Sequence, residues 1–222
     1  MRRDNYFTEK NKARKVTKWL TVLAGYYSRK RKIDFELEKA ALLIIDMQEF
    51  FTAANAPAFL PAAETIIREI QCLKEHFYRR DRPVIMTKFY VKREQQEPPN
   101  IMIKWWGRTL FEDNPFVGID SRIQDEKALV LYKPMYDAFY QTKLESLLKE
   151  QNVTQIVITG VATHLCIETT ARSAFIRNFT VFLPVDATAT YTEEMHLNTL
   201  KAAAHGFGVP VRTNDLMEKN EK

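Results

Sequence analysis

The sequence contains few cysteines and histidines and has no long hydrophobic segment. Its two cysteines, Cys72 and Cys166, are too few for a disulfide framework or for a metal site built from thiolates alone. No stretch approaches the roughly 20 consecutive apolar residues that a membrane-spanning helix needs. These absences predict a soluble protein in a reducing, cytoplasmic setting, with no membrane partner.

The chain has 222 residues, of which 45% are hydrophobic, and this is enough for one ordinary domain with its own core. Its net charge of +5 is unevenly placed. Residues 1–40 hold 12 Lys and Arg against 5 Asp and Glu, or +7, and the other 182 residues hold 21 against 23, or −2. Because the body of the protein is almost neutral, we predict no nucleic-acid partner for it.

The basic segment has the pattern of an amphipathic helix. Apolar residues recur at helical spacing, with Lys and Arg on the opposite face, at Val16, Trp19, Leu20, Leu23 and Tyr27. We therefore divide the chain into a basic helical arm, residues 1–39, and a main domain, residues 40–222. The apolar face must be covered, either by the main domain or by a neighbouring subunit. Binding of the arm to RNA or to a membrane surface is the alternative.

From residue 40 onward, short apolar runs alternate with helical patterns. The runs are typical of strands covered on both faces and span residues 41–45, 84–89, 128–132, 156–159, 181–185 and 209–212. This alternation predicts an α/β fold, a three-layer αβα sandwich around a parallel sheet. Residues 92–125 interrupt it with prolines and large aromatics. Insertions at strand ends often form a pocket wall, so we expect that role for this loop region.

Three residues with chemical potential stand where predicted strands end. Asp46 and Lys133 each follow an apolar run, and Cys166 lies where a strand gives way through Gly160 to a helix. A thiol in the first turn of a helix experiences the positive end of the helix dipole, which lowers its pKa. Each residue also has an ordinary interpretation: a helix cap for Asp46, a solvated lysine for Lys133 and a small buried side chain for Cys166.

Parallel strands present their carboxyl ends at one edge of the sheet, so these three side chains can meet there. Asp46 would then act as the general base, Lys133 as its electrostatic partner and Cys166 as the nucleophile. Cys72 lies within a predicted helix, residues 61–80, and not at the end of a predicted strand. The pattern therefore favours one reactive cysteine, Cys166.

The same segments resemble the isochorismatase-like cysteine hydrolase superfamily, which includes nicotinamidases, N-carbamoylsarcosine amidases and ureidoacrylate or biuret amidohydrolases. The resemblance spans about residues 40–212. Its three motifs occur in the order found in the family: residues 45–48, which contain Asp46, residues 133–144, which begin at Lys133, and residues 160–172, which contain Cys166. Three motifs in order make the resemblance specific.

The resemblance implies a Rossmann-like, doubly wound six-stranded sheet, usually in a homo-oligomer, and a catalytic triad of Asp46, Lys133 and Cys166. It also implies a cis peptide bond between Val161 and Ala162, and an oxyanion hole formed by the backbone N–H groups of Ala162 and Cys166. In the amidase members the thiolate attacks an amide carbonyl, an amine leaves, and water hydrolyses the thioester. A small-molecule substrate is therefore expected.

Departures from the family pattern narrow the choice of member. Nicotinamidases carry an Asp-x-His motif after the second strand, where this chain has Thr87-Lys88-Phe89-Tyr90, and its four histidines offer no suitable metal pair. We predict no metal and no cofactor. Isochorismatases tend to have an arginine in the segment where this chain has Lys133-Pro134-Met135-Tyr136, and they commonly lack the cysteine. An amidohydrolase acting on a C–N bond is therefore preferred over isochorismate hydrolysis.

The residues expected to bind substrate lie near the three motifs and in the loop region. They are Phe50, Phe51, Trp105, Trp106, Tyr136, Phe139, Thr163 and His164. The aromatic residues could instead be ordinary core or subunit contacts, and His164 could simply lie at the rim of the site. A different class of function, a non-catalytic interaction protein that uses the basic arm, competes with the enzyme. The joint presence of Asp46, Lys133 and Cys166 argues against it, because no structural role requires that trio.

Overall fold

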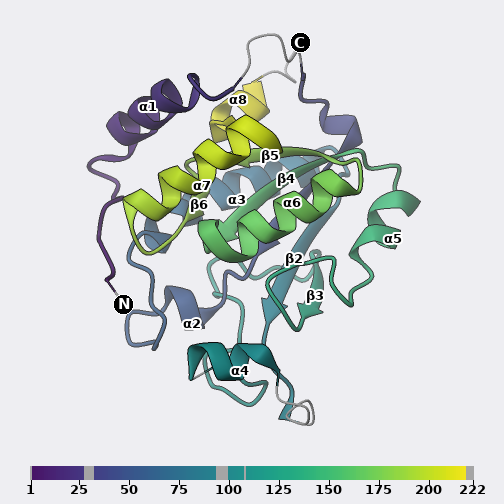
Figure 1. Cartoon of the computed structure of the whole chain (residues 1–222). Coiled ribbons are helices and arrows are strands. Elements are labelled where there is room, and N and C mark those ends of the chain that lie inside the picture. The colour runs from purple at the N-terminus through teal and green to yellow at the C-terminus, as the bar shows by residue number, and fades with distance from the viewer. Residues whose placement is uncertain (1, 28–32, 94–99, 108, 219–222) are drawn as a thin grey trace.

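A parallel sheet forms the centre of the molecule (Figure 1). The computed structural model describes residues 2–27, 33–93, 100–107 and 109–218. The strands are β1 (Ala40–Ile45), β2 (Val84–Phe89), β3 (Leu129–Lys133), β4 (Gln155–Val161), β5 (Thr180–Pro184), β6 (Thr188–Ala189) and β7 (Val209–Val211). The order is β3-β2-β1-β4-β5-β7, with β6 paired to β4. All six predicted strands are present, and the α/β sandwich is confirmed.

The seventh strand, β6, was not predicted, because two residues are too short to show a hydrophobic period. The strand order runs outward in both directions from β1 and β4, which is a doubly wound arrangement. Its switch point lies between these two strands, where Ile45 pairs with Gly160. In such sheets the crevice at the carboxyl ends of the switch-point strands receives the ligand.

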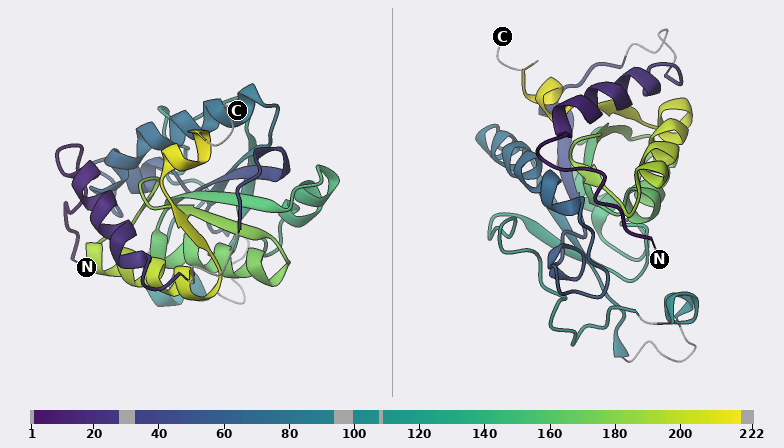
Figure 2. Two further views of the ribbon diagram at one scale, coloured as in Figure 1. Left: turned by 90° about the horizontal axis from the view of Figure 1, so that it is seen from above. Right: turned by 90° about the vertical axis from the view of Figure 1, so that its left-hand side faces the viewer.

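Helices cover both faces of the sheet. They are α1 (Lys12–Leu23), α2 (Glu49–Thr52), α3 (Ala63–Arg79), α4 (Ile101–Trp106), α5 (Leu144–Glu150), α6 (Glu168–Ile176), α7 (Glu193–Gly206) and α8 (Thr213–Glu218). The view from above shows α3 on one face and α6 with α7 on the other (Figure 2). The carboxyl ends of β2 and β3 point toward α4, which belongs to the interrupting loop region (Figure 1).

The N-terminal helix packs on its own chain. Val16, Trp19 and Leu23 are buried in the main hydrophobic core, so the predicted apolar face is the buried one. The indole Nε1 of Trp19 donates a hydrogen bond of 2.8 Å to Glu193 Oε1 on α7, and Lys15 forms an ion pair with the same carboxylate. The main domain therefore covers the arm helix. Residues 28–32 of the arm lie outside the described residues, and the boundary at residue 40 stays a prediction.

The loop region after β2 forms a small apolar cluster of its own. Phe89, Val91, Met102 and Leu110 are buried together there. Asn100 caps α4 by accepting a hydrogen bond from the backbone N–H of Met102, and Gly107 ends the helix in a left-handed conformation. Residues 94–99 and 108 of this region lie outside the described residues. Among the helices that the structure describes, none combines the length and apolarity needed to cross a bilayer.

Gly160 allows β1 and β4 to approach closely at the switch point. Its φ is +105°, and a Cβ atom there would lie 2.1 Å from the carbonyl oxygen of Ile45. Replacing Gly160 with alanine is expected to lower the free energy of unfolding by about 3 kcal/mol or more, because both the backbone and the packing are violated. Urea unfolding followed by circular dichroism measures this. Gly206→Ala is the matched control, since nothing lies within 4 Å of its added Cβ, and an equal loss in both variants would contradict the argument.

Candidate active site

Asp46, Lys133 and Cys166 meet at the carboxyl edge of the sheet. Asp46 follows β1, Lys133 ends β3, and Cys166 lies in a π-helical turn, Thr163–Ile167, between β4 and α6. The Lys133 Nζ atom is 2.7 Å from Asp46 Oδ2 and 3.4 Å from Cys166 Sγ. The side chains of Asp46 and Lys133 are fully buried, and Cys166 is 6% exposed. The three residues singled out from the sequence are thus assembled by the fold.

Neighbouring groups hold the two charged side chains in place. Asp46 has a left-handed φ of 49°, and its Oδ1 atom accepts a hydrogen bond of 2.7 Å from Thr87 Oγ1. The same hydroxyl oxygen accepts from the Asp46 backbone N–H, at 3.2 Å. Lys133 Nζ also donates to the carbonyl oxygen of Met135, at 3.0 Å. Thr87 was not predicted as a site residue, because a threonine inside a strand is common and no pattern in the sequence distinguishes this one.

Burial determines the protonation of the site. Burial raises the pKa of the Cys166 thiol above its usual range; the Lys133 ammonium opposes this effect, and the Asp46 carboxylate, which accepts a hydrogen bond from the thiol, adds to it. Burial alone would lower the pKa of Lys133, but the charges of Asp46 and Cys166 outweigh burial and raise it. At rest the site therefore holds a thiol beside an ammonium–carboxylate pair. The lowered thiol pKa expected at a helix start is wrong for this buried position, and Cys166 needs a base.

This protonation pattern predicts an unusual pH dependence of thiol alkylation. If the thiol proton moves to Asp46 during attack, the rate at which iodoacetamide alkylates Cys166 should change little between about pH 6 and pH 8. In Asp46→Asn the alkylation rate should be lower than in the wild type. It should also rise about tenfold for each unit of increasing pH, because the thiolate must form by exchange with solvent. Peptide mass spectrometry measures both sites, with the exposed Cys72 as the internal reference. A wild-type rate that itself rises tenfold per unit would contradict proton transfer to Asp46.

A cavity of about 310 Å³ opens onto Cys166. Four of the predicted substrate-binding residues line it: Phe50, Phe51, Trp106 and Tyr136. Ala162, predicted for the oxyanion hole, also lines it, and the peptide bond between Val161 and Ala162 is cis. The Trp106 indole N–H donates a hydrogen bond of 2.8 Å to the Tyr136 hydroxyl, which joins the loop region to the segment after β3.

The other four predicted substrate-binding residues lie elsewhere in the described structure and do not line this cavity. Trp105 is 74% exposed, and Phe139 stacks on Phe179 in the core. Thr163 Oγ1 lies 2.9 Å from His196 Nδ1, so it holds the nucleophile turn against α7. His164 Nδ1 lies 2.6 Å from Thr190 Oγ1. Adjacent residues in a helix or turn point in different directions, so only some of them face the cavity. The spacing of the motifs did not show which ones.

Several lining residues were not predicted, and they come from distant parts of the sequence. They are Arg3, Pro57, Ala58, Phe89, Met102, Thr109, Leu110, Leu165 and Tyr191. Arg3 lies near the N-terminus, before the first motif, and Tyr191 lies after the third motif. Neither residue lies in a sequence pattern that suggests a site. Arg3 reaches the cavity only through the packing of the N-terminal segment.

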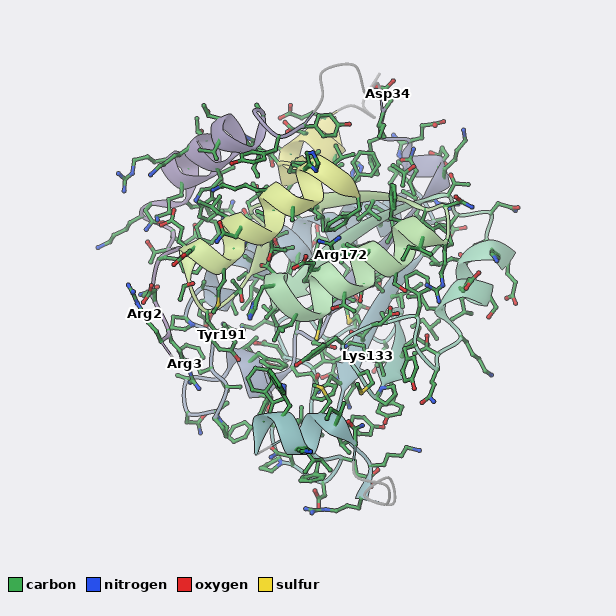
Figure 3. All side chains as sticks on the ribbon, in the orientation of Figure 1. Arg2, Arg3, Asp34, Lys133, Arg172 and Tyr191 are labelled. Atoms are coloured by element: carbon green, nitrogen blue, oxygen red, sulfur yellow. The ribbon has the colours of Figure 1, made fainter. Side chains whose placement is uncertain are left out.

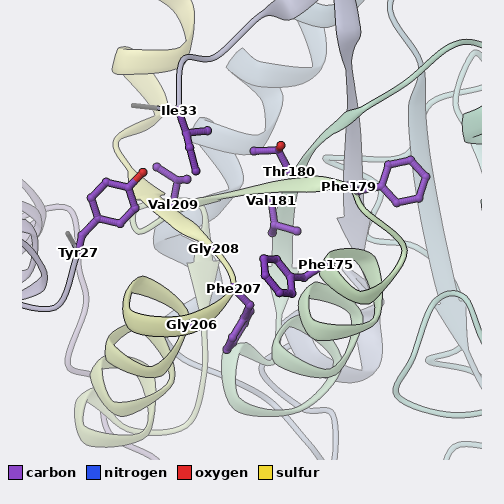
Figure 4. A pocket seen from close by; sticks show the side chains of 10 residues that line it. All are labelled: Tyr27, Ile33, Phe175, Phe179, Thr180, Val181, Gly206, Phe207, Gly208 and Val209. Carbon is purple, nitrogen blue, oxygen red and sulfur yellow. The ribbon is translucent and has the colours of Figure 1, made fainter. Parts of the chain in front are cut away.

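A second cavity, of about 250 Å³, lies at the opposite edge of the sheet. It is lined by residues at the amino ends of β5 and β7 and at the ends of α6 and α7, and Figure 4 shows Phe175, Phe207 and Val209 around it. Apart from the hydroxyls of Tyr27 and Thr180, its side chains are apolar. Among the residues that the structure describes, no acid, base or nucleophile lines this second cavity. The cavity at Cys166 is the candidate active site, because Cys166 lines it and contacts Lys133, which pairs with Asp46.

The motif order and the fold agree with the comparison to known proteins. Residues 40–215 match the family model described as the isochorismatase domain. The chain belongs to the isochorismatase family. It is thus a hydrolase of the isochorismatase-like group, whose relatives include amidases and nicotinamidases, and the predicted family is confirmed.

Individual relatives support this membership. This isochorismatase-family chain is 34% identical over 189 residues to Enterobactin synthase component B from Escherichia coli K12, with 84% of the chain matching 66% of that protein. It is 33% identical to Nicotinamidase 3 from Arabidopsis thaliana, covering 86% of the chain and 92% of the relative. A cysteine hydrolase from Pseudomonas syringae shares its fold, with a TM-score of 0.80, 20% identity and coverage of 86% and 98%.

Within the described ranges, no group of three His, Cys, Asp or Glu side chains is placed to hold a metal ion. The expected absence of a metal and of a cofactor stays a prediction.

Proposed function

We propose that this isochorismatase-family hydrolase cleaves a C–N amide or ureide bond of a small molecule through a thioester at Cys166. The observation that carries the proposal is the contact of Lys133 Nζ with both Asp46 Oδ2, at 2.7 Å, and Cys166 Sγ, at 3.4 Å, beside a cavity of about 310 Å³. A nucleophile, a base and a fixed positive charge are the groups that acyl transfer needs. A cavity of this volume suits a small substrate.

The first half-reaction uses the protonated thiol. Asp46 accepts the thiol proton while Sγ forms a bond to the substrate carbonyl carbon, and the carbonyl π electrons move onto oxygen. Lys133 keeps its proton and stabilises the thiolate character of sulfur as it develops. Asp46 then gives its proton to the leaving nitrogen as the C–N bond breaks. Ammonia or an amine leaves, and a thioester to Cys166 remains.

The second half-reaction reverses these roles. Asp46 takes a proton from water as the water oxygen attacks the thioester carbonyl, and the C–S bond breaks. The acid product leaves, and the proton returns to sulfur. Throughout, the total charge of the three side chains and the substrate stays constant, which suits a buried site where new charge is costly.

Backbone N–H groups are the proposed oxyanion donors. Ala162 and Cys166 both line the cavity. The turn that carries them is held by the N–H groups of Leu165 and Ile167, which both donate to the carbonyl oxygen of Ala162. Backbone donors at the cavity wall are suited to bind the oxygen that becomes negative in the tetrahedral intermediate.

The test is ammonia release across a panel of small amides and ureides, with intact-mass analysis of the enzyme to trap a thioester. A substrate that yields ammonia and an adduct on Cys166 supports the proposal and identifies the substrate class. The isochorismatase from Bacillus subtilis is 29% identical to this chain, so isochorismate belongs in the same panel. Turnover of isochorismate without an adduct would replace the amidase proposal with vinyl-ether hydrolysis.

A panel with no turnover at all would favour the non-catalytic interaction protein. The homo-oligomer and the cytoplasmic location stay predictions, and size-exclusion chromatography of the full chain measures the first of them.

A further inference from the structure

The N-terminal segment, which lies outside the matched family domain, forms part of the wall of the active-site cavity. Arg3 lines the same cavity as Cys166, and Figure 3 shows it beside Tyr191. Of the fifteen residues that line the cavity, Arg3 is the one with a permanently charged side chain. Lys133 does not line it, because its ammonium is fully buried against Asp46.

Several contacts hold Arg3 at this place. The backbone N–H of Asp4 donates a hydrogen bond of 2.8 Å to the carbonyl oxygen of Tyr191, and the Tyr6 hydroxyl accepts one of 3.2 Å from the N–H of Thr190. Tyr6 is buried. The Arg3 guanidinium donates to the carbonyl oxygen of Pro57, and its Cζ atom lies 5.9 Å from the centre of the Tyr191 ring. The segment is thus tied to both sides of the cavity mouth.

The charge of Arg3 has no acidic partner in the described part of the chain. The nearest acidic residue in sequence, Asp4, pairs with Arg2 instead, at 2.8 Å. A guanidinium has five N–H donors in a planar fork that matches a carboxylate, and the Pro57 carbonyl uses part of that fork. The rest of the cavity lining is apolar or uncharged. An anionic group entering the cavity would therefore find one cation at the mouth.

We propose that Arg3 is a specificity-determining residue that binds an anionic group, of the carboxylate class, on the substrate whose carbonyl reaches Cys166. The inference rests on the proposed function, since it places the substrate of Cys166 in this cavity. A substrate of this class is an amide or ureide that carries a carboxylate at its far end. The arm would then contribute both to the core, through Trp19, and to substrate selection, through Arg3.

Alkylating reagents test this without a known substrate. Iodoacetylglycine and iodoacetyl-β-alanine each carry one carboxylate, and the two reagents differ in its distance from the reactive carbon. The primary amide of each reagent is its uncharged control. The rates of Cys166 labelling by acid and amide are compared by peptide mass spectrometry in wild type, Arg3→Gln and Arg2→Gln, with Cys72 as the reference for intrinsic reactivity. Arg2 is the control because it is adjacent, exposed and already paired with Asp4.

We expect the acid-to-amide rate ratio at Cys166, for the reagent of matching length, to fall about fivefold in Arg3→Gln at low ionic strength, because exposed charge pairs are weak. Arg2→Gln should keep the wild-type ratio, and added sodium chloride should lower the wild-type ratio toward that of Arg3→Gln. An unchanged ratio in Arg3→Gln overturns the proposal, and so does equal slowing of both reagents, which indicates a structural role only. Slow labelling of Cys166 by every reagent, no faster than Cys72, overturns the proposed function and this inference with it.

Discussion

Replacement of Cys166 with alanine should lower kcat/KM for the best substrate of the amide panel by about 10⁴-fold or more. The covalent route disappears with the sulfur atom, and Asp46 and Lys133 alone provide no nucleophile for the acyl group. The alanine side chain is smaller than that of cysteine, so the fold should tolerate it. Initial rates of ammonia release, with intact-mass analysis for the missing thioester, measure the effect.

Cys72→Ala is the matched control for that experiment. Cys72 is exposed on α3, and the residues that line the active-site cavity do not include it. Its replacement should leave kcat/KM unchanged. If Cys166→Ala retains more than a few per cent of the wild-type rate, a water molecule activated by Asp46 performs the reaction, and the thioester mechanism is wrong.

Replacement of Lys133 with methionine should lower the free energy of unfolding by about 3–5 kcal/mol, because it leaves the fully buried Asp46 carboxylate without its cationic partner. Urea unfolding monitored by circular dichroism measures this loss. The double variant Asp46→Asn with Lys133→Met should be more stable than Lys133→Met alone, since removing both charges removes the uncompensated one. Both variants should be inactive.

The matched control is Lys149→Met, which breaks the pair of Lys149 with Glu145 on the surface of α5. Solvent screens that pair, so its loss should change stability far less than the loss of Lys133. Equal losses in Lys133→Met and Lys149→Met would contradict this argument, and so would a double variant that is no more stable than Lys133→Met. In either case an uncompensated buried charge is not the cause of the lost stability.

Asp46 and Lys133 show how much of the site could be predicted from sequence. Each follows a continuous apolar run, which marks a strand of the parallel sheet. The expected burial on both faces holds for β1 but is wrong for β3, because β3 is an edge strand and exposes Leu129 and Val130. Because parallel strands end at the same edge, two charged residues at strand ends could be expected to meet. The protonation of Cys166 could not be predicted in this way. Its raised pKa depends on burial. Burial depends on tertiary packing around Cys166, where α2, α4 and the N-terminal segment all contribute residues to the cavity wall.

The cavity wall shows the same limit. Phe50, Phe51, Trp106 and Tyr136 were identified because they lie near the motifs, and all four line the cavity. Trp105, directly beside Trp106, points to solvent because neighbours on a helix face different directions. Thr87 and Tyr191 reach the site from strand and loop positions that carry no distinctive pattern.

Four features could be predicted from the amino-acid sequence: the fold class, the six main strands, the family and the three residues that meet at the sheet edge. These follow from local periodicity and from motif order, which are properties of short segments. The tertiary structure alone decided that the arm helix packs on its own chain through Trp19, that Thr87 orients Asp46, and that Arg3 joins the cavity. Contacts between residues far apart in the chain are set by the packing of whole elements, and no pattern within a single segment records them.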